Sequence, residues 1–145
     1  KRIEAITDGM MMNCGLLQGD FPDAEKILPT EFKTKCLVNA DELRNALKCG
    51  SVVNNKQNLV KLEVGKSSIK VMNNSEEAEY EADVQCSTQG DPLKIAFNLK
   101  YLMNTLNSIG SDNVVLNFNS SVSPCVANGQ DMDGTRLVLP VRVQG

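Results

Sequence analysis

The sequence predicts an α+β domain made of two similar halves, each a strand followed by a helix and three further strands. The main observation is an internal repeat: "CLVNADELRNALK" at residues 36–48 aligns with "IAFNLKYLMNTLN" at residues 95–107, an offset of 59 residues. A second observation is that three short β-prone segments follow each repeat. Two such halves, related by a pseudo-two-fold axis, would place both helices on one face of antiparallel sheets.

Residues 1–20 predict a β-hairpin. "RIEAI" precedes a turn at Asp8 and Gly9, and "MMMNCGLLQ" follows that turn. The next segment carries two prolines and several acids, so residues 21–30 are expected to form a linker that includes a short helical turn. The hairpin is therefore expected to belong to a different structural unit from residues 31–145.

Each repeat has the start, the apolar face and the end of a helix. An asparagine after a β-prone residue is a good N-cap, because its side-chain oxygen accepts hydrogen bonds from the first free amides. Two leucines four residues apart lie on one helical face, and a glycine is a common end signal. These residues are Asn39, Leu43, Leu47 and Gly50 in the first repeat, and Asn98, Leu102, Leu106 and Gly110 in the second.

Three strands are predicted after each helix from runs of β-prone and alternating apolar residues. The predicted strands cover residues 58–64, 69–72 and 79–86 in the first half, and 113–118, 122–127 and 135–143 in the second. Pro140 interrupts the last one, and proline cannot donate a hydrogen bond to a neighbouring strand.

Composition narrows the class of protein. A net charge of -3 gives no sign of nucleic-acid or membrane binding, and the chain has no apolar stretch of about 18 residues and no signal-peptide pattern. The five cysteines include no C-x-x-C pair, which predicts buried free thiols in a reducing cytosol, so a cytoplasmic location is expected.

No motif supports catalysis. The chain has no histidine, no nucleophile elbow and no metal-ligand cluster, so neither an enzyme nor a cofactor or metal site is expected. "GKSS" at 65–68 lacks the earlier glycine of a phosphate-binding loop and lies between two strands, which favours a hairpin turn. "DMDG" at 131–134 lacks the spacing of a calcium loop and is expected to be a polar turn.

The acidic run "NNSEEAEYEAD" at 73–83 leaves two interpretations open. It is either a solvated edge strand protected by its charge or a subunit edge that pairs with a basic partner.

Three segments resemble a known family. "LLQGDFPDAEKILP", "FNLKYLMNTLN" and the closing "LVLPVRV" are similar, in this order, to the bacterial DNA sliding clamps, the beta subunits of DNA polymerase III. The resemblance covers the C-terminal third of such a clamp. It implies that residues 1–20 are the last hairpin of the middle clamp domain, that 21–30 link the domains, and that 31–145 form the C-terminal domain with the DNA-clamp, or processivity, fold.

The resemblance also implies a function. Two three-domain clamp chains close into a homodimeric ring that encircles duplex DNA without reading its sequence, with helices lining the hole. Such a ring is a non-catalytic processivity factor in DNA replication. It binds the polymerase III alpha subunit, the clamp loader and repair polymerases through short peptide motifs, and it has no membrane partner. An alternative is a stand-alone peptide-binding module with the same fold and no ring.

Three sets of site residues follow from the resemblance. The partner-peptide pocket maps to Pro22, Lys26, Ile27, Asn98, Tyr101, Leu137, Val138, Leu139, Pro140, Val141 and Arg142. The basic residues expected to face DNA are Arg44, Lys48 and Lys100, for which ordinary surface charge is the equal alternative. The ring interface maps to Val52, Val53, Glu76, Glu77, Glu79 and Glu81, for which the alternative is that the two valines belong to the core.

Overall fold

The computed structural model describes residues 1–20, 23–53 and 58–142. The N-terminal part contains the strands β1 (Arg2–Thr7) and β2 (Met10–Gly15) and the short helix α1 (Ala24–Ile27). The first half contains β3 (Thr34–Asn39), α2 (Ala40–Gly50), β4 (Leu59–Val64), β5 (Ser68–Asn74) and β6 (Glu79–Gly90). The second half contains β7 (Leu93–Asn98), α3 (Leu99–Asn107), β8 (Asn113–Phe118), β9 (Cys125–Gly129) and β10 (Arg136–Val138).

The eight strands of the two halves form one antiparallel sheet in the order β10-β9-β8-β3-β6-β5-β4-β7. Each half inserts its first strand next to the other half, since β3 pairs with β8 and β7 pairs with β4. The long strand β6 continues the sheet through a bend: its first part pairs with β5 and its last part pairs with β3. The predicted fold class is therefore confirmed, with its two strand-helix-three-strand halves.

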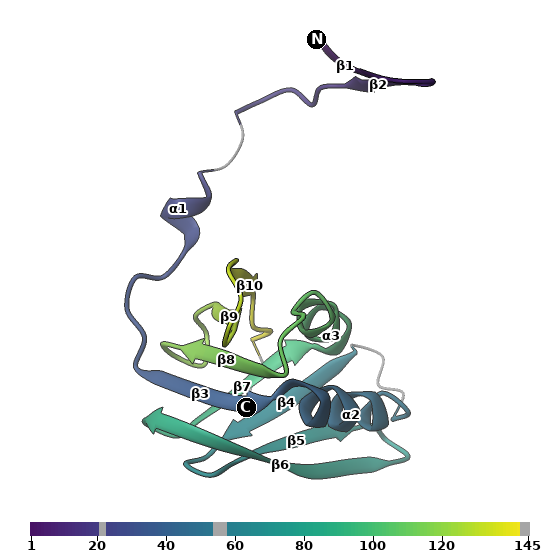
Figure 1. The fold of residues 1–145 in the computed structure, drawn as a ribbon. Helices are drawn as coiled ribbons and strands as arrows, with labels where there is room; N and C mark the ends of the chain where they lie inside the picture. The colour runs from purple at the N-terminus through teal and green to yellow at the C-terminus, as the bar shows by residue number, and fades with distance from the viewer. Residues whose placement is uncertain (21–22, 54–57, 143–145) are drawn as a thin grey trace.

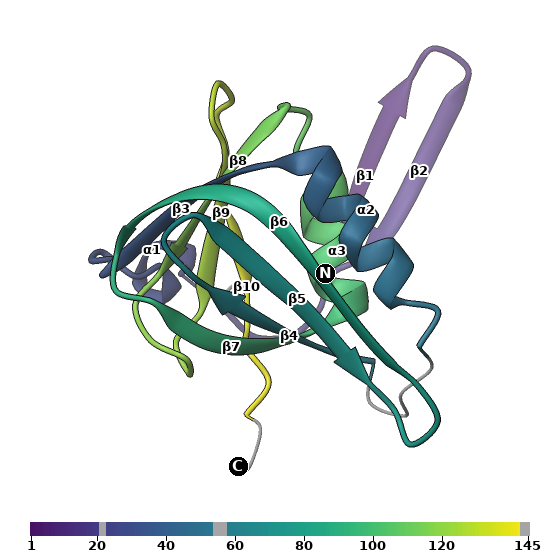
Figure 2. The ribbon, with the colours of Figure 1, turned by 90° about the horizontal axis from the view of Figure 1, so that it is seen from below.

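Helices α2 and α3 lie side by side on one face of this sheet (Figures 1 and 2). The four leucines of the repeat are at most 1% exposed, so they form the centre of the core. Both predicted N-caps are present: the side-chain oxygen of Asn39 accepts from the amides of Asp41 and Glu42, and that of Asn98 accepts from Lys100 and Tyr101. None of the described helices is long and apolar enough to cross a membrane.

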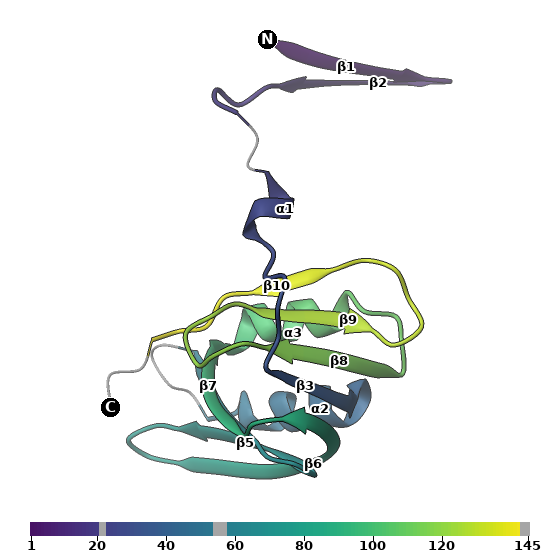
Figure 3. The same cartoon turned by 90° about the vertical axis from the view of Figure 1, so that its left-hand side faces the viewer.

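The hairpin of β1 and β2 stands apart from the eight-stranded body, with α1 between them (Figures 1 and 3). Its register pairs Thr7 with Met10 across the predicted turn, where Gly9 adopts a φ of 83° that favours glycine. All residues of both strands are exposed, so this hairpin contributes nothing to the core of the body.

The prediction that glycines end the two helices is wrong. The C-caps are Ser51 and Ser108, both in the right-handed helical region, and neither Gly50 nor Gly110 has a positive φ. Gly50 is closely packed instead, because a Cβ there would lie 3.0 Å from the ring of Tyr80, which would have to shift to make room for it.

The prediction of buried thiols holds for Cys36 and Cys125 and is wrong for Cys14 and Cys49, which are exposed. Burial raises the pKa of both Cys36 and Cys125 to about 12, so these two thiols stay protonated at neutral pH.

Two predicted strands of the second half are too long. Residues 122–124 lie in the turn before β9, and the last strand ends at Val138 rather than at residue 143. The reason is visible in the tail, defined here as residues 137–142, which leaves β9 after Val138 and crosses to β7.

Candidate functional site

The tail closes the seam between the two edges of the sheet. Pro140 forms an isolated antiparallel bridge with Phe97, and the amide of Val141 donates to the carbonyl of Ala96 at 2.8 Å. β7 therefore pairs with β4 along one edge and touches the tail along the other. Figure 2 shows the tail, in yellow, running past the end of β7.

Side chains along the tail alternate between the core and the surface. Val138 is 3% exposed, whereas Leu139 is 66% exposed and Val141 is 37% exposed. With the half-buried Leu137, these two residues present a row of aliphatic side chains on the outside of the sheet. Such a row suits apolar side chains of a bound peptide.

Asn98 lies beside this row because it follows Phe97, the residue bridged to Pro140. Its side-chain oxygen is used by the helix cap, at 3.0 Å from the amide of Lys100, and this fixes the direction of the side chain. Tyr101, one turn into α3, is 64% exposed and so is free to contact a ligand.

The remaining residues predicted for the peptide pocket come from the linker. Lys26 and Ile27 lie in α1, which stands over the side of the body formed by β9 and β10 (Figures 1 and 3). Lys26 forms an exposed ion pair with Asp23 at 3.3 Å, and Ile27 is 51% exposed. Pro22 lies outside the described residues. Arg142 ends the described tail and lies on its surface.

A groove of about 610 Å³ next to the tail was missed by the sequence reasoning. Its walls come from the outer face of β4, β5 and β7, the turn before β9, and the end of the tail. Val122, Val141 and Ala96 line its apolar part, and Lys61 and Lys94 line its charged part. The sequence does indicate which residues of each strand face outward, because apolar and polar residues alternate along the strands. It does not indicate which strands lie side by side, so the outward-facing residues could not be combined into one groove.

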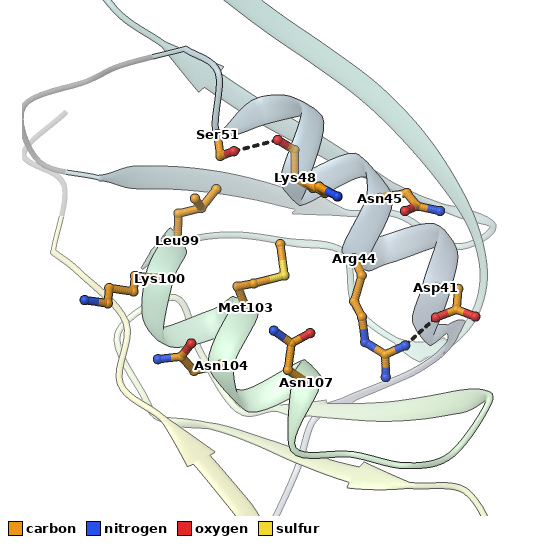
Figure 4. A pocket seen from close by; sticks show the side chains of 10 residues that line it. All are labelled: Asp41, Arg44, Asn45, Lys48, Ser51, Leu99, Lys100, Met103, Asn104 and Asn107. Carbon is orange, nitrogen blue, oxygen red and sulfur yellow. Dashed lines mark hydrogen bonds and ion pairs between the residues drawn. The ribbon is translucent and has the colours of Figure 1, made fainter.

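A second groove, of about 560 Å³, runs between α2 and α3 and contains all three basic residues predicted to face DNA (Figure 4). Arg44, Lys48 and Lys100 line it together with three asparagines, which are Asn45, Asn104 and Asn107. This face therefore presents amide and cationic groups, with Asp41 as its carboxylate.

Arg44 differs from the two lysines because its guanidinium is already bound. It donates to the carbonyl of Leu106 at 3.0 Å and to that of Ile109 at 2.9 Å, and it pairs with Asp41. The carbonyl of Leu106 lies in the last turn of α3 and also accepts from the amide of Ile109, and the carbonyl of Ile109 lies two residues beyond the helix. Arg44 thus joins α2 to the end of α3.

The residues predicted for the ring interface gather at one end of the body. The turn after α2 carries Val52, which is 83% exposed, and Val53, which is half-buried, so the alternative that both belong to the core is wrong for Val52. The side chain of Asn73 on β5 donates to the carbonyls of Gly50 at 2.7 Å and Val53 at 3.3 Å. These bonds hold the turn against the β5–β6 hairpin.

The acidic residues lie on that same hairpin. Glu76 and Glu77 are exposed in the turn between β5 and β6, and Glu79 is exposed at the start of β6. Glu81, further along β6, pairs with Lys70 at 3.6 Å.

Nearby, burial and the Cys49 thiol raise the pKa of Tyr80, so its phenol is neutral at physiological pH. Among the residues described, no cluster of three or more acidic, cysteine or histidine side chains could hold a metal ion.

Known proteins are similar to this chain in sequence and in fold. A family model described as DNA polymerase III beta subunit, C-terminal domain, matches residues 25–142. The beta sliding clamp of Pseudomonas aeruginosa is 30% identical over 144 residues, which cover 97% of this chain and 39% of that protein. The beta sliding clamp of Vibrio cholerae is 28% identical over 144 residues, with the same coverage.

Solved structures agree. The crystal structure of the DNA polymerase III beta subunit from Thermotoga maritima matches with a TM-score of 0.90 and 30% identity, covering 99% of this chain and 40% of that chain. A sliding clamp from Pseudomonas aeruginosa, crystallised with a ligand, matches with a TM-score of 0.91 and 28% identity.

The fold is thus that of a sliding-clamp domain. The chain belongs to the family of the DNA polymerase III beta subunit, C-terminal domain. It spans about two fifths of the length of the curated relatives that it matches.

Proposed function

We propose that this chain is the C-terminal part of a sliding clamp, a cytoplasmic and non-catalytic processivity factor of a DNA polymerase holoenzyme. Residues 1–20 are the last hairpin of a middle domain, 21–30 are the linker, and 31–145 are the third domain. The whole protein forms a homodimeric ring around duplex DNA. The observation that carries the proposal is the tail, whose aliphatic row lies beside the capped Asn98 on a sliding-clamp fold.

The tail row takes the apolar side chains of short peptides from the polymerase alpha subunit, the clamp loader and repair polymerases. The aliphatic walls of Leu139 and Val141 supply contact area, and the Asn98 amide group orients the peptide backbone. Lys26, Ile27 and Tyr101 complete the rim of the pocket, together with Pro22.

The face between α2 and α3 lies toward DNA and contacts phosphates without reading bases, as sliding requires. Lys48 and Lys100 carry this contact, because the guanidinium of Arg44 is held by backbone carbonyls and Asp41. The end of the body formed by Val52, Val53 and the acidic β5–β6 hairpin meets the first domain of the second chain.

Peptide binding tests the proposal. A fluorescent peptide of the type Gln-Leu-x-Leu-Phe, with serine at x, is titrated against the 145-residue chain and followed by anisotropy. We expect Pro140→Asp and Leu139→Asp to weaken binding by about tenfold or more, because each buries a charge under the peptide. Leu139 is mostly exposed, so its variant keeps the fold.

The matched control is Pro92→Asp, which places the same substitution in the exposed turn between β6 and β7. Equal affinity for the unchanged chain, the control and both tail variants would reject the tail as the binding site. The coding sequence upstream of Lys1 tests the ring: two further clamp-like domains are expected there, whereas a start codon directly before Lys1 would favour a stand-alone module.

A further inference from the structure

The groove beside the tail differs from the aliphatic row in its charge. It opens on the outer face of β4 and β7, where Lys61 and Lys94 line it, and Arg142 lines it from the tail. Its apolar floor is formed by Ala96 and Met72. The groove and the row share Val141, so they are continuous with each other.

Lysines on this outer face differ in whether they have an acidic partner. Lys94 pairs with Glu63 at 3.1 Å, directly across the β4–β7 register. Lys70 pairs with Glu81 at 3.6 Å diagonally between β5 and β6, where its direct neighbour is another acid, Asp83.

Lys61 has no such partner among the residues that the structure describes. Its direct neighbours across the two registers are Ala96 on β7 and Met72 on β5. Arg142 likewise has no ion pair within the described part of the chain, and both residues are exposed. Of the three cations that line the groove, Lys61 and Arg142 thus lack an acidic partner within the described residues, whereas Lys94 is paired with Glu63.

We propose that this groove binds an acidic residue in the segment that flanks the apolar motif of a partner peptide. The inference rests on the proposed function, because the apolar motif must occupy the tail row for its flank to reach the groove. The carboxylate meets Lys61 and Arg142, and the neighbouring aliphatic part of the flank covers Met72 and Ala96. The groove thereby selects among partners that share the same apolar motif.

The test compares three labelled peptides with the same Gln-Leu-Ser-Leu-Phe core. One has neutral flanks, one has two glutamates before the core, and one has two glutamates after it. We expect one of the acidic peptides to bind about fivefold more tightly than the neutral peptide at low salt, and this gain to disappear at about 0.5 M salt because exposed charges are screened.

Lys61→Gln should remove this gain and leave the affinity for the neutral peptide unchanged. The matched control is Lys66→Gln, in the exposed turn between β4 and β5, which should keep the gain. Lys61→Glu should reverse the preference, so that a peptide with lysines at the same flank binds more tightly than the acidic one.

The outcomes separate the inference from the proposed function. Equal binding of neutral and acidic peptides, or a gain that persists in Lys61→Gln, would overturn the inference while leaving the tail pocket in place. Failure of every peptide to bind would overturn the proposed pocket and the inference together.

Discussion

Arg44 illustrates how a residue changes role once its contacts are known. By sequence it is one of three cations on the helices expected to face DNA. In the structure its side chain is 23% exposed, and its guanidinium donates to the carbonyl of Leu106 in the last turn of α3 and to that of Ile109 just after the helix. Arg136 donates to the carbonyl between them, that of the C-cap Ser108, at 2.9 Å. Two arginines thus bind the carbonyl end of one helix, where positive charge is also favoured by the helix dipole.

Replacing Arg44 is therefore expected to affect stability rather than charge alone. Arg44→Ala should lower the free energy of unfolding by about 1–3 kcal/mol, because it removes the side-chain donor to the partly buried carbonyl of Ile109 and a second donor to that of Leu106. Arg44→Lys keeps the charge but lacks the planar fork of donors, so it should lose most of the same amount. Urea unfolding followed by circular dichroism measures the change.

The matched control is Lys48→Ala, one turn further along α2, for which a change within about 0.5 kcal/mol is expected. A variant Arg44→Lys as stable as the unchanged chain would show that only the positive charge matters, and it would return Arg44 to the DNA-facing set.

At the scale of elements, the caps were predictable and the helix ends were not. The N-cap asparagines follow from a local rule, since their side chains bond amides only two and three residues away. Distant residues add bonds to the C-terminal ends that the local Ser51 and Ser108 caps do not supply: Asn73 donates to the carbonyl of Gly50 in α2, and Arg44 donates to that of Leu106 in α3. Nothing near Gly50 or Gly110 in the sequence indicates these partners, so the local glycine rule was misleading.

The positions of the strands in the sequence were also partly predictable, but their neighbours in the sheet were not. The predicted strand at residues 113–118 coincides with β8, because a run of β-prone apolar residues between two asparagines marks it even though its alternation is not strict. Sequence periodicity does not reveal which strands become neighbours, so neither the groove beside the tail nor the isolation of Lys61 could be predicted. The tail residues were placed by family resemblance, whereas their division between core and surface needed the pairing with β7.

The two chemical groups of the Asn98 side chain allow its two proposed roles to be separated. Asn98→Asp keeps an oxygen for the cap and adds a charge that suits a helix N-terminus, so stability should change by less than about 0.5 kcal/mol. It removes the amide donor proposed to orient the peptide, so affinity for the neutral peptide should fall severalfold. Unfolding and anisotropy titrations on the same sample measure the two effects.

Asn98→Ala serves as the contrast, because it removes both groups and should cost about 1 kcal/mol of stability as well. The equivalent change Asn39→Asp, at the other cap, should leave peptide affinity unaltered. If Asn98→Asp bound the peptide as tightly as the unchanged chain, Asn98 would be a helix cap alone.

At the scale of the whole molecule, the two halves differ most where the candidate pocket lies. In the first half, β3 pairs with β6 from Thr34 to Val38, and the last pair joins Val38 to Cys86. In the second half, the residue equivalent to Val38 is Phe97, and its partner is Pro140. Proline has no amide hydrogen to donate, and within the tail as described, up to Arg142, the ladder consists of one bridge and one hydrogen bond. The symmetric body is thereby left with one weakly paired seam, which the tail covers.

This seam should open first when the tail is removed. A chain that ends after Val138 loses the hydrogen bond between Val141 and Ala96 and the cover over β7, so its free energy of unfolding should fall by about 1–3 kcal/mol. Amides on the tail-facing edge of β7 should exchange with deuterium faster, while those of β3, which is paired on both sides, should keep their relative protection. A chain that ends after Arg142 keeps the bridge and the hydrogen bond, so it is the control for truncation itself. Equal stability and equal exchange of the β7 amides in the two truncated chains would contradict this prediction. It would mean that the tail contacts the sheet without stabilising the edge of β7.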